Sequence, residues 1–178
     1  LNKPVIFTGA QLPISAMRSD ARENLMTSLE IATAKINGEP IVPEVCIFFN
    51  HLLLRGNRSK KVQSVHFDAF ESENYPPLAE SGIVIDYNTQ AIRPLETHKK
   101  LVNRNSLDNN VLILKLFPGI TQNVIDATLN IKGLKAIVLE TYGSGNSPSE
   151  EWFMDSLQKA IKKGIIILNV SQFTRTGK

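Results

Sequence analysis

Two short segments hold the residues whose types and spacing could do chemistry. The first is the basic cluster Arg55–Lys61, with the sequence RGNRSKK. A lysine held close to a hydroxyl stabilises the ionised form of that hydroxyl, or carries a proton itself when burial lowers its own pKa. Such a cluster could therefore activate a nucleophile. A solvated basic turn is the alternative interpretation, and spacing alone does not decide between the two.

The second segment is the glycine-rich turn Tyr142–Pro148, between a predicted strand and a predicted helix. Its two glycines permit positive φ angles or a close approach of a ligand to the backbone. Ser147, Pro148 and Glu150 predict a helix start, whose free N–H groups favour a carboxylate or a phosphate. Asn146 could bind such a ligand or fill a left-handed turn position. An ordinary strand-to-helix turn remains the alternative to a site.

Several other chemistries lack the residues that they need. The chain has no G-x-S-x-G segment, and its three histidines follow neither a triad nor a metal-ligand spacing. The turn at 142–148 is no dinucleotide fingerprint, because Pro148 stands in the place of the third glycine. The single cysteine, Cys46, excludes an internal disulfide and is typical of a small core residue. We therefore expect no metal site.

Charge and hydropathy argue against nucleic-acid and membrane partners. The formal net charge is only +3, and the basic cluster precedes an acidic stretch, residues 62–92, without lysine or arginine. Neighbouring opposite charges more often neutralise each other than form the broad basic face of a nucleic-acid site. No apolar run approaches the ~18 residues of a membrane-spanning helix. We expect neither kind of partner.

The elements that must position these segments follow an α/β pattern. Apolar, β-branched runs predict strands at residues 4–8, 45–49, 52–54, 83–87, 111–117, 135–140 and 165–170. After residue 111 the strands alternate with helical patterns at 121–129 and 148–163, which predicts a parallel sheet. Open parallel sheets bind ligands beyond the carboxyl ends of their strands. The candidate sites are therefore the loops at 9–18, 118–119 and 143–146 and the region after residue 170.

A further helix is predicted to start at Asp20, where Asp20 and Glu23 resemble a capping box. Its apolar residues at helical spacing are Leu25, Leu29, Ala32 and Ile36. Gly38 and Pro40 are expected to end it, and Gly56-Asn57 to form a turn after the strand at 52–54.

The residue strings themselves carry more information than the patterns. The relevant strings are KPVIFTGAQLPIS (3–15), MRSDARENL (17–25), RGNRSKK (55–61), HFDAF with the stretch that follows it (66–83), LFPGI (116–120) and YGSGNSP (142–148). In this order they resemble bacterial L-asparaginases, and most closely the cytoplasmic type I branch. Each string is weak evidence alone, but together they are highly specific and extend over essentially the whole chain.

The resemblance implies an α/β amidohydrolase built of parallel-sheet three-layer sandwiches. Residues 1–88 would be the C-terminal part of an N-terminal asparaginase domain, residues 89–110 a linker, and residues 111–178 a smaller, Rossmann-like C-terminal domain that is cut short. The family hydrolyses L-asparagine to L-aspartate and ammonia with a threonine nucleophile, and without metal or organic cofactor. The resemblance also implies a cytoplasmic homodimer or homotetramer, and leaves L-glutamine open as a substrate.

The resemblance assigns three site residues. Lys61 matches the lysine that assists the nucleophile together with a Thr-Asp pair. Ala10 matches the position whose backbone carbonyl receives the substrate amide. Asn146 matches an asparagine that a neighbouring subunit contributes to the substrate pocket. Asp20 and Asn24 match family positions too, and we interpret them as helix cap and helix packing.

Two family motifs do not occur in the 178 residues: the glycine-rich turn with the nucleophilic threonine, and H-G-T-D-T. With a start at Leu1 instead of methionine, this predicts a piece of a longer asparaginase that is inactive alone. Lys60, Glu140 and Phe173 differ from the residues expected for regulation by asparagine, so we expect none. Two alternatives stay open: the asparaginase-like subunit of a tRNA-dependent amidotransferase, and an inactive binding or oligomerisation domain.

Overall fold

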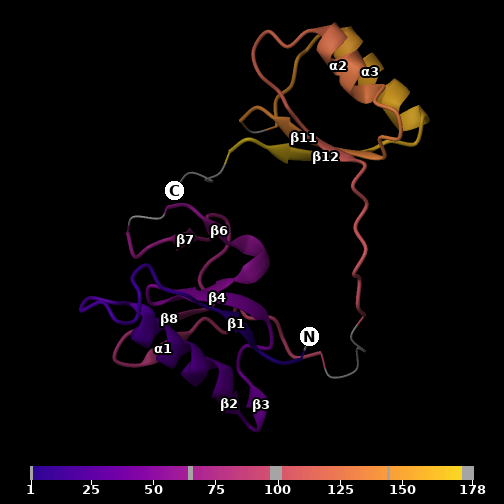
Figure 1. Ribbon diagram of the computed structural model, residues 1–178. Helices are drawn as coiled ribbons and strands as arrows, with labels where there is room; N and C mark the ends of the chain where they lie inside the picture. The colour runs from indigo at the N-terminus through magenta and orange to yellow at the C-terminus, as the bar shows by residue number, and fades with distance from the viewer. Residues whose placement is uncertain (1, 64–65, 97–101, 144, 174–178) are drawn as a thin grey trace. The chain divides into compact units, whose positions relative to one another are not determined.

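The computed structural model describes residues 2–63, 66–96, 102–143 and 145–173. The chain divides into two compact units, Leu1–Val102 and Asn103–Lys178, which are described separately below (Figure 1). The division falls within the stretch 89–110, which the sequence predicts to be a linker.

The first unit is built on a five-stranded mixed sheet. Its strands, in spatial order, are β1 (Val5–Phe7), β4 (Val45–Phe49), β5 (Leu52–Arg55), β8 (Ala79–Ser81) and β9 (Ile85–Tyr87). β1 and β4 are parallel, whereas the other neighbours are antiparallel. The chain reverses between β4 and β5 at Asn50 and His51, both of which have positive φ. The predicted turn at Gly56-Asn57 is instead a 3-10 helix, η1 (Gly56–Arg58).

The helix α1 (Ala21–Thr33) packs on β1 and β4, but not through its apolar residues at the predicted helical spacing. Its buried residues are Asn24, Ser28 and Ile31, whereas Leu25 and Leu29 are 47% and 53% exposed. The apolar spacing does not mark the buried face, because two polar side chains of the inner face find hydrogen-bond partners there, at Gly9 and within the helix. One of them is Asn24, whose burial agrees with its interpretation as a helix-packing residue. Ile36 is not helical either: it lies in the short hairpin of β2 (Lys35–Ile36) and β3 (Glu39–Pro40).

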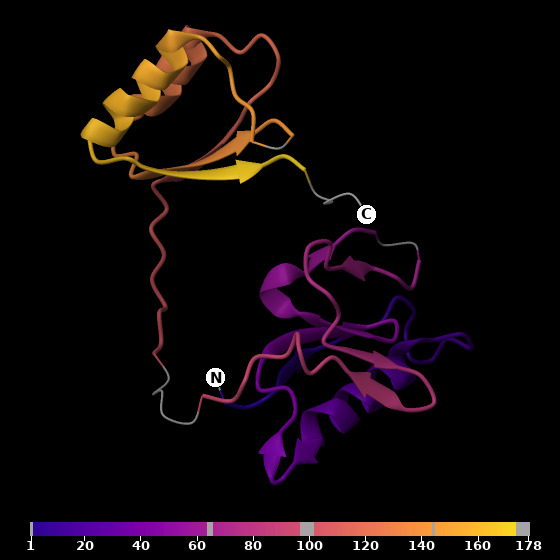
Figure 2. The same ribbon diagram turned by 180° about the vertical axis from the view of Figure 1, so that it is seen from behind.

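A second hairpin, β6 (Lys60–Lys61) and β7 (Phe70–Glu71), lies on the side of the sheet opposite α1 (Figures 1 and 2). The buried residues of the core are Ile31, Val42, Cys46, Phe48, Leu53, Leu78, Ala79 and Ala91. Cys46 is a core residue, as predicted, and burial raises the pKa of its thiol to about 12. The thiol is therefore protonated near neutral pH and is no nucleophile.

The second unit confirms the predicted alternation of strands and helices. Its three-stranded sheet, β10 (Val111–Lys115), β11 (Ala136–Thr141) and β12 (Ile166–Ser171), is parallel throughout, in that order. The helices α2 (Gln122–Leu129) and α3 (Glu151–Lys162) lie on the same face of this sheet (Figures 1 and 2). The predicted start of α3 at Ser147-Pro148 is wrong, because the chain stays non-helical up to Glu150. The α/β fold class is confirmed.

The core of the second unit lies between its sheet and its helices. Its largest fully buried side chains are Leu116, Ile125, Ile137 and Phe153. Alternate residues of the strands point to the other face of the sheet, where Val111, Ile113, Ile166 and Leu168 are exposed. No helix in the described part of either unit is both long enough and apolar enough to cross a membrane.

Candidate functional site

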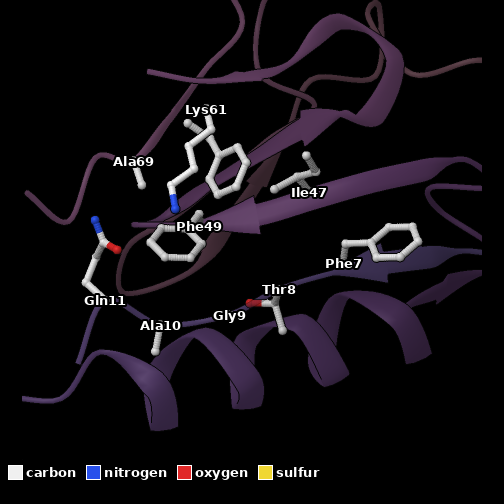
Figure 3. Close-up of a pocket in the computed structure, with 10 residues that line it drawn as sticks. Phe7, Thr8, Gly9, Ala10, Gln11, Ile47, Phe49, Lys61 and Ala69 are labelled. Carbon is white, nitrogen blue, oxygen red and sulfur yellow. The ribbon is translucent and has the colours of Figure 1, made fainter. Parts of the chain in front are cut away.

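A cavity of about 230 Å³ opens in the first unit where β1 ends (Figure 3). Its lining consists of Phe7, Thr8, Gly9, Ala10, Gln11, Ile47, Phe49, Lys61, Ala69 and Phe70. Two of the three predicted site residues, Lys61 and Ala10, therefore line one cavity although they are distant in the sequence. The position agrees with the expectation that a site follows a strand end of the sheet.

The hairpin β6–β7 carries Lys61 into this cavity. Lys60 pairs with Glu71 and Lys61 with Phe70 in the antiparallel register, and the Val62 N–H donates to the Ala69 carbonyl at 2.9 Å. Successive side chains of a strand point to opposite faces, so the two lysines have different surroundings.

Lys60 forms an ion pair with Glu73 at 2.5 Å between Nζ and Oε1. The ammonium group of Lys61 instead points toward the segment Gly9–Gln11 (Figure 3). Within the described part of the chain Lys61 has no ion-pair partner. Its charge is thus free to act on a group that enters the cavity.

The loop that carries Ala10 is held by two side chains at the N-terminal end of α1. The Asp20 carboxylate accepts the backbone N–H groups of Gln11, at 3.0 Å to each oxygen, and of Leu12, at 3.2 Å. The Asn24 side-chain amide donates to the Gly9 carbonyl at 2.9 Å and to Asp20 at 3.1 Å. Asp20 is the N-cap residue of α1, as predicted, and its backbone carbonyl accepts the N–H of Asn24 at 3.0 Å. The expected capping box is absent, because both carboxylate oxygens bind the loop and the side chain makes no cap hydrogen bond.

Two residues at the cavity were missed in the sequence. Phe49 packs its ring 5.3 Å from that of Phe70 and lines the cavity, whereas its neighbour Phe48 is a core residue. Gln11 lines the cavity and its amide donates to the His66 carbonyl at 2.6 Å. The string T-G-A-Q contained the signal for Gln11, but alternation along the strand at 45–49 does not say which phenylalanine meets a cavity.

Arg55, at the start of the basic cluster, is neither solvated nor at the cavity. Its guanidinium donates to both carboxylate oxygens of Glu44, at 2.6 and 2.9 Å, and both side chains are nearly fully buried. The guanidinium also lies over the ring of Tyr75, 4.2 Å from its centre, and donates to the Ala91 carbonyl at 3.0 Å. Arg55 is therefore a structural residue of the core.

Two opposing effects act on the pKa of the Glu44 carboxyl. Burial raises the pKa of the Glu44 carboxyl, whereas the hydrogen bond from Arg55, the backbone N–H of Arg93 and the charges of both arginines lower it. The effects that lower the pKa are together larger than the effect of burial. The pKa of Glu44 therefore lies below its usual range, and the group is ionised near neutral pH. The same pair raises the pKa of Arg55.

Asn146 belongs to the second unit and is exposed in the turn after β11. Tyr142 and Asn146 exchange two backbone hydrogen bonds, at 2.8 and 3.0 Å, which close the turn. Gly143 and Gly145 have the positive φ angles that the sequence permits. Ser144 of the predicted turn lies outside the described residues. The turn presents the Asn146 side chain to solvent.

Other chemistries find no site in the described residues. Among them, no group of three or more His, Cys, Asp or Glu side chains could hold a metal ion. His51 lies 3.3 Å from Glu23 and 3.5 Å from Ser81, but both contacts involve its Nδ1. A serine–histidine–acid relay needs both ring nitrogens, so this group is no catalytic triad. His98 lies outside the described residues.

The fold and the cavity together define an α/β protein with a lysine facing a backbone loop at a strand end. Residues 1–93 match the family model described as "Asparaginase, N-terminal", and residues 110–177 match the one described as "Glutaminase/Asparaginase C-terminal domain". The chain belongs to the asparaginase family.

Similar proteins cover nearly the whole chain. It is 42% identical to the "60 kDa lysophospholipase" of Mus musculus over 95% of this chain and 29% of that protein. It is 38% identical to "L-asparaginase 1" of Escherichia coli (strain K12) over 97% of this chain and 49% of that protein. The crystal structure of L-asparaginase I from Vibrio cholerae matches with a TM-score of 0.82 and 36% identity, over 99% of this chain and 53% of that one.

A more distant relative is a glutamyl-tRNA(Gln) amidotransferase subunit of Pyrococcus abyssi, which is 29% identical over 97% of this chain and 39% of that protein. The chain thus spans about half the length of its bacterial relatives and less than a third of the mouse protein.

Proposed function

We propose that the protein containing this chain is an L-asparaginase, which hydrolyses L-asparagine to L-aspartate and ammonia. The observation that carries the proposal is the cavity in which Lys61 faces the loop of Ala10. Membership of the asparaginase family supports it. In the reaction the amide C–N bond of the asparagine substrate breaks, and water supplies the hydroxyl of the new carboxyl group and a proton of ammonia.

The two cavity residues have complementary roles in this proposal. The Lys61 ammonium stabilises the ionised hydroxyl of a threonine nucleophile, which attacks the amide carbon. The Ala10 backbone carbonyl accepts an N–H of the substrate amide and fixes its orientation. The motifs that would contain this threonine and its Thr-Asp helpers do not occur in the 178 residues. We therefore propose that these residues supply part of the site and are inactive by themselves.

Asn146 has the third role. We propose that a neighbouring subunit places it at the substrate, because it lies in a separate unit and its turn presents it to solvent. This requires a homo-oligomer, a dimer or a tetramer. We further propose a cytoplasmic enzyme without metal or organic cofactor, consistent with a single buried cysteine and with a lysine-assisted threonine, which needs no metal.

The direct test is ammonia release by the purified whole protein without any partner. Release from L-asparagine supports an asparaginase, and the ratio of kcat/KM for L-asparagine and L-glutamine gives the preference. The 178-residue chain assayed in parallel should release no ammonia above the blank. Turnover by this chain alone would overturn the proposal that the nucleophilic threonine is not among these 178 residues.

The second candidate function is that of an amidotransferase subunit, which the identity to the Pyrococcus abyssi protein favours. Such a subunit would consume glutamine and depend on its partner, so release of ammonia from free L-asparagine without a partner excludes it. Because the mouse relative is named a lysophospholipase, the assay also includes lysophosphatidylcholine as a substrate. A whole protein inactive on all of these substrates would support a binding or oligomerisation domain.

A further inference from the structure

We propose that Asp20 and Asn24 are positioning residues that direct the Ala10 carbonyl toward the substrate amide and strengthen it as an acceptor. This inference rests on the proposed asparaginase function. It goes beyond it because it assigns a role in turnover to two side chains at α1 that do not line the cavity.

The hydrogen bonds of the loop hold the peptide groups on both sides of Ala10. The Asn24 amide binds the Gly9 carbonyl, which belongs to the peptide group before Ala10. The Asp20 carboxylate binds the Gln11 N–H, which belongs to the same peptide group as the Ala10 carbonyl. Both contacts come from one turn of one helix, since residues four apart share a helix face.

The geometry of a trans peptide then fixes the direction of the Ala10 carbonyl. The N–H and C=O of a planar trans peptide group point in opposite directions, and the described residues contain no cis peptide bond. The Gln11 N–H points to Asp20, at the start of α1, so the Ala10 carbonyl points away from α1. Lys61 lies on that other side of the loop (Figure 3). The carbonyl is therefore directed to the side from which Lys61 enters the cavity.

Charge gives Asp20 a second effect. A carboxylate that accepts an N–H polarises the peptide group and makes its carbonyl oxygen a stronger acceptor. In the proposed reaction that oxygen binds the nitrogen that leaves as ammonia. The effect depends on the negative charge of Asp20, which a neutral side chain of the same shape does not reproduce.

Burial explains why Asn24 holds Asp20 in place. Asn24 is only 3% exposed, and its amide bridges the Gly9 carbonyl and Asp20 Oδ2. A buried donor shared by two acceptors fixes both of them, because breaking the contact would leave buried polar groups without partners.

The test compares Asp20→Asn and Asn24→Ala with Ser28→Ala in the whole protein. Ser28 is a buried residue of the same helix face, and its hydroxyl donates to the Asn24 carbonyl inside the helix rather than to the loop. We expect kcat for L-asparagine to fall about 10²-fold in the first two variants, as for a catalytic contact misplaced by about 1 Å. KM should change less than about threefold, and Ser28→Ala should keep normal turnover.

Two further measurements make the outcomes distinct. The first is amide hydrogen exchange at Gln11 and Leu12, which should accelerate in Asp20→Asn. The second is the Tm of each variant, and all activity assays are run well below it. If Asn24→Ala does not fold, Asp20→Asn decides alone. A wild-type protein that releases no ammonia overturns the proposed function and this inference with it. An active wild type whose Asp20→Asn variant keeps kcat, despite faster exchange at Gln11, overturns this inference alone.

Discussion

Replacing Arg55 by methionine should destabilise the first unit more than any substitution at its surface. The methionine keeps most of the aliphatic stem, so the main loss is the guanidinium that donates two hydrogen bonds to Glu44, at 2.6 and 2.9 Å. Glu44 is 6% exposed and keeps the N–H of Arg93 at 2.7 Å. The variant thus contains a buried carboxylate that has lost its buried counter-charge and keeps only the exposed Arg93 guanidinium, 4.0 Å away.

The expected loss in free energy of unfolding follows from the lost charge partner of Glu44. Breaking a buried ion pair by removing one partner costs about 3–5 kcal/mol, and about 1.4 kcal/mol changes an equilibrium constant tenfold. The unfolded population of the first unit should therefore rise about 10²- to 4 × 10³-fold. Arg58→Met is the matched control, because Arg58 is exposed and only lies over the Tyr75 ring, at 5.8 Å.

The assay uses Cys46, the single cysteine, which is fully buried in the core of the first unit. Its labelling by a disulfide reagent requires opening of that unit, and the labelling rate follows the open population when closing is fast. The rate, normalised to that of the unfolded protein, should rise by the same factor of about 10² to 4 × 10³ in Arg55→Met, and less than about tenfold in Arg58→Met.

The pH dependence of the stability loss tests whether the buried charge of Glu44 causes it. In the wild type the pKa of Glu44 is lowered in the folded state, so its contribution to stability is present above its ordinary value and is lost as pH falls through the lowered value. In Arg55→Met the lowering effects of Arg55 are lost and burial is opposed only by the backbone N–H and the charge of Arg93. The pKa of Glu44 is therefore higher than in the wild type, and protonation relieves part of the penalty. The cost of the substitution should shrink from about pH 7 to about pH 5, and Glu44→Gln added to Arg55→Met should recover part of the loss. A cost that does not vary with pH and is not relieved by Glu44→Gln would refute this reasoning.

Two further predictions concern the second unit. Asn146→Ala in the whole protein should raise KM for L-asparagine about tenfold with little change in kcat, since it removes a contact to bound substrate; an unchanged KM would contradict its role. Gly143→Ala should destabilise the second unit more than Gly164→Ala, because both positions have positive φ but only at Gly143 would a Cβ lie 3.1 Å from the Phe173 ring. The difference should be about 1 kcal/mol in urea unfolding followed by Trp152 fluorescence, and equal midpoints would contradict it.

Most of the longer strands were predictable from the sequence because they are apolar, β-branched runs between turn residues. The short strands β2, β3, β6, β7 and β8 were not predicted, because two or three residues carry no periodic pattern. The second unit followed in addition from strict alternation with helices, which permits few topologies. The inner face of α1 was not predictable in the same way. Its buried residues include Asn24, whose burial depends on a hydrogen bond to Gly9, fifteen residues earlier in the chain. Periodicity of apolar residues cannot show such a contact.

The site shows a similar division. Composition and spacing left the cluster at 55–61 undecided between a solvated turn and a site, and it contains both a core residue and a cavity residue. Arg55 ends β5 and is buried because its guanidinium pairs with the buried carboxylate of Glu44. The side chains of Lys60 and Lys61 point to opposite faces because the two residues are neighbours in β6. Only the resemblance to asparaginases singled out Lys61 and Ala10, and the structure brings them to one cavity. The N-cap position of Asp20 was predictable, but the partner of its carboxylate was not, because a capping side chain and a loop acceptor have the same sequence signature.

The most direct measurement is the rate of ammonia release from L-asparagine by the whole protein and by its Lys61→Met and Lys60→Met variants. The two lysines are adjacent, but Lys60 pairs with Glu73 whereas Lys61 points into the cavity. An asparaginase assisted by Lys61 should lose about 10³-fold or more in kcat in Lys61→Met and keep nearly normal turnover in Lys60→Met. Equal activity of the two variants, or no ammonia from the wild type, would contradict the account.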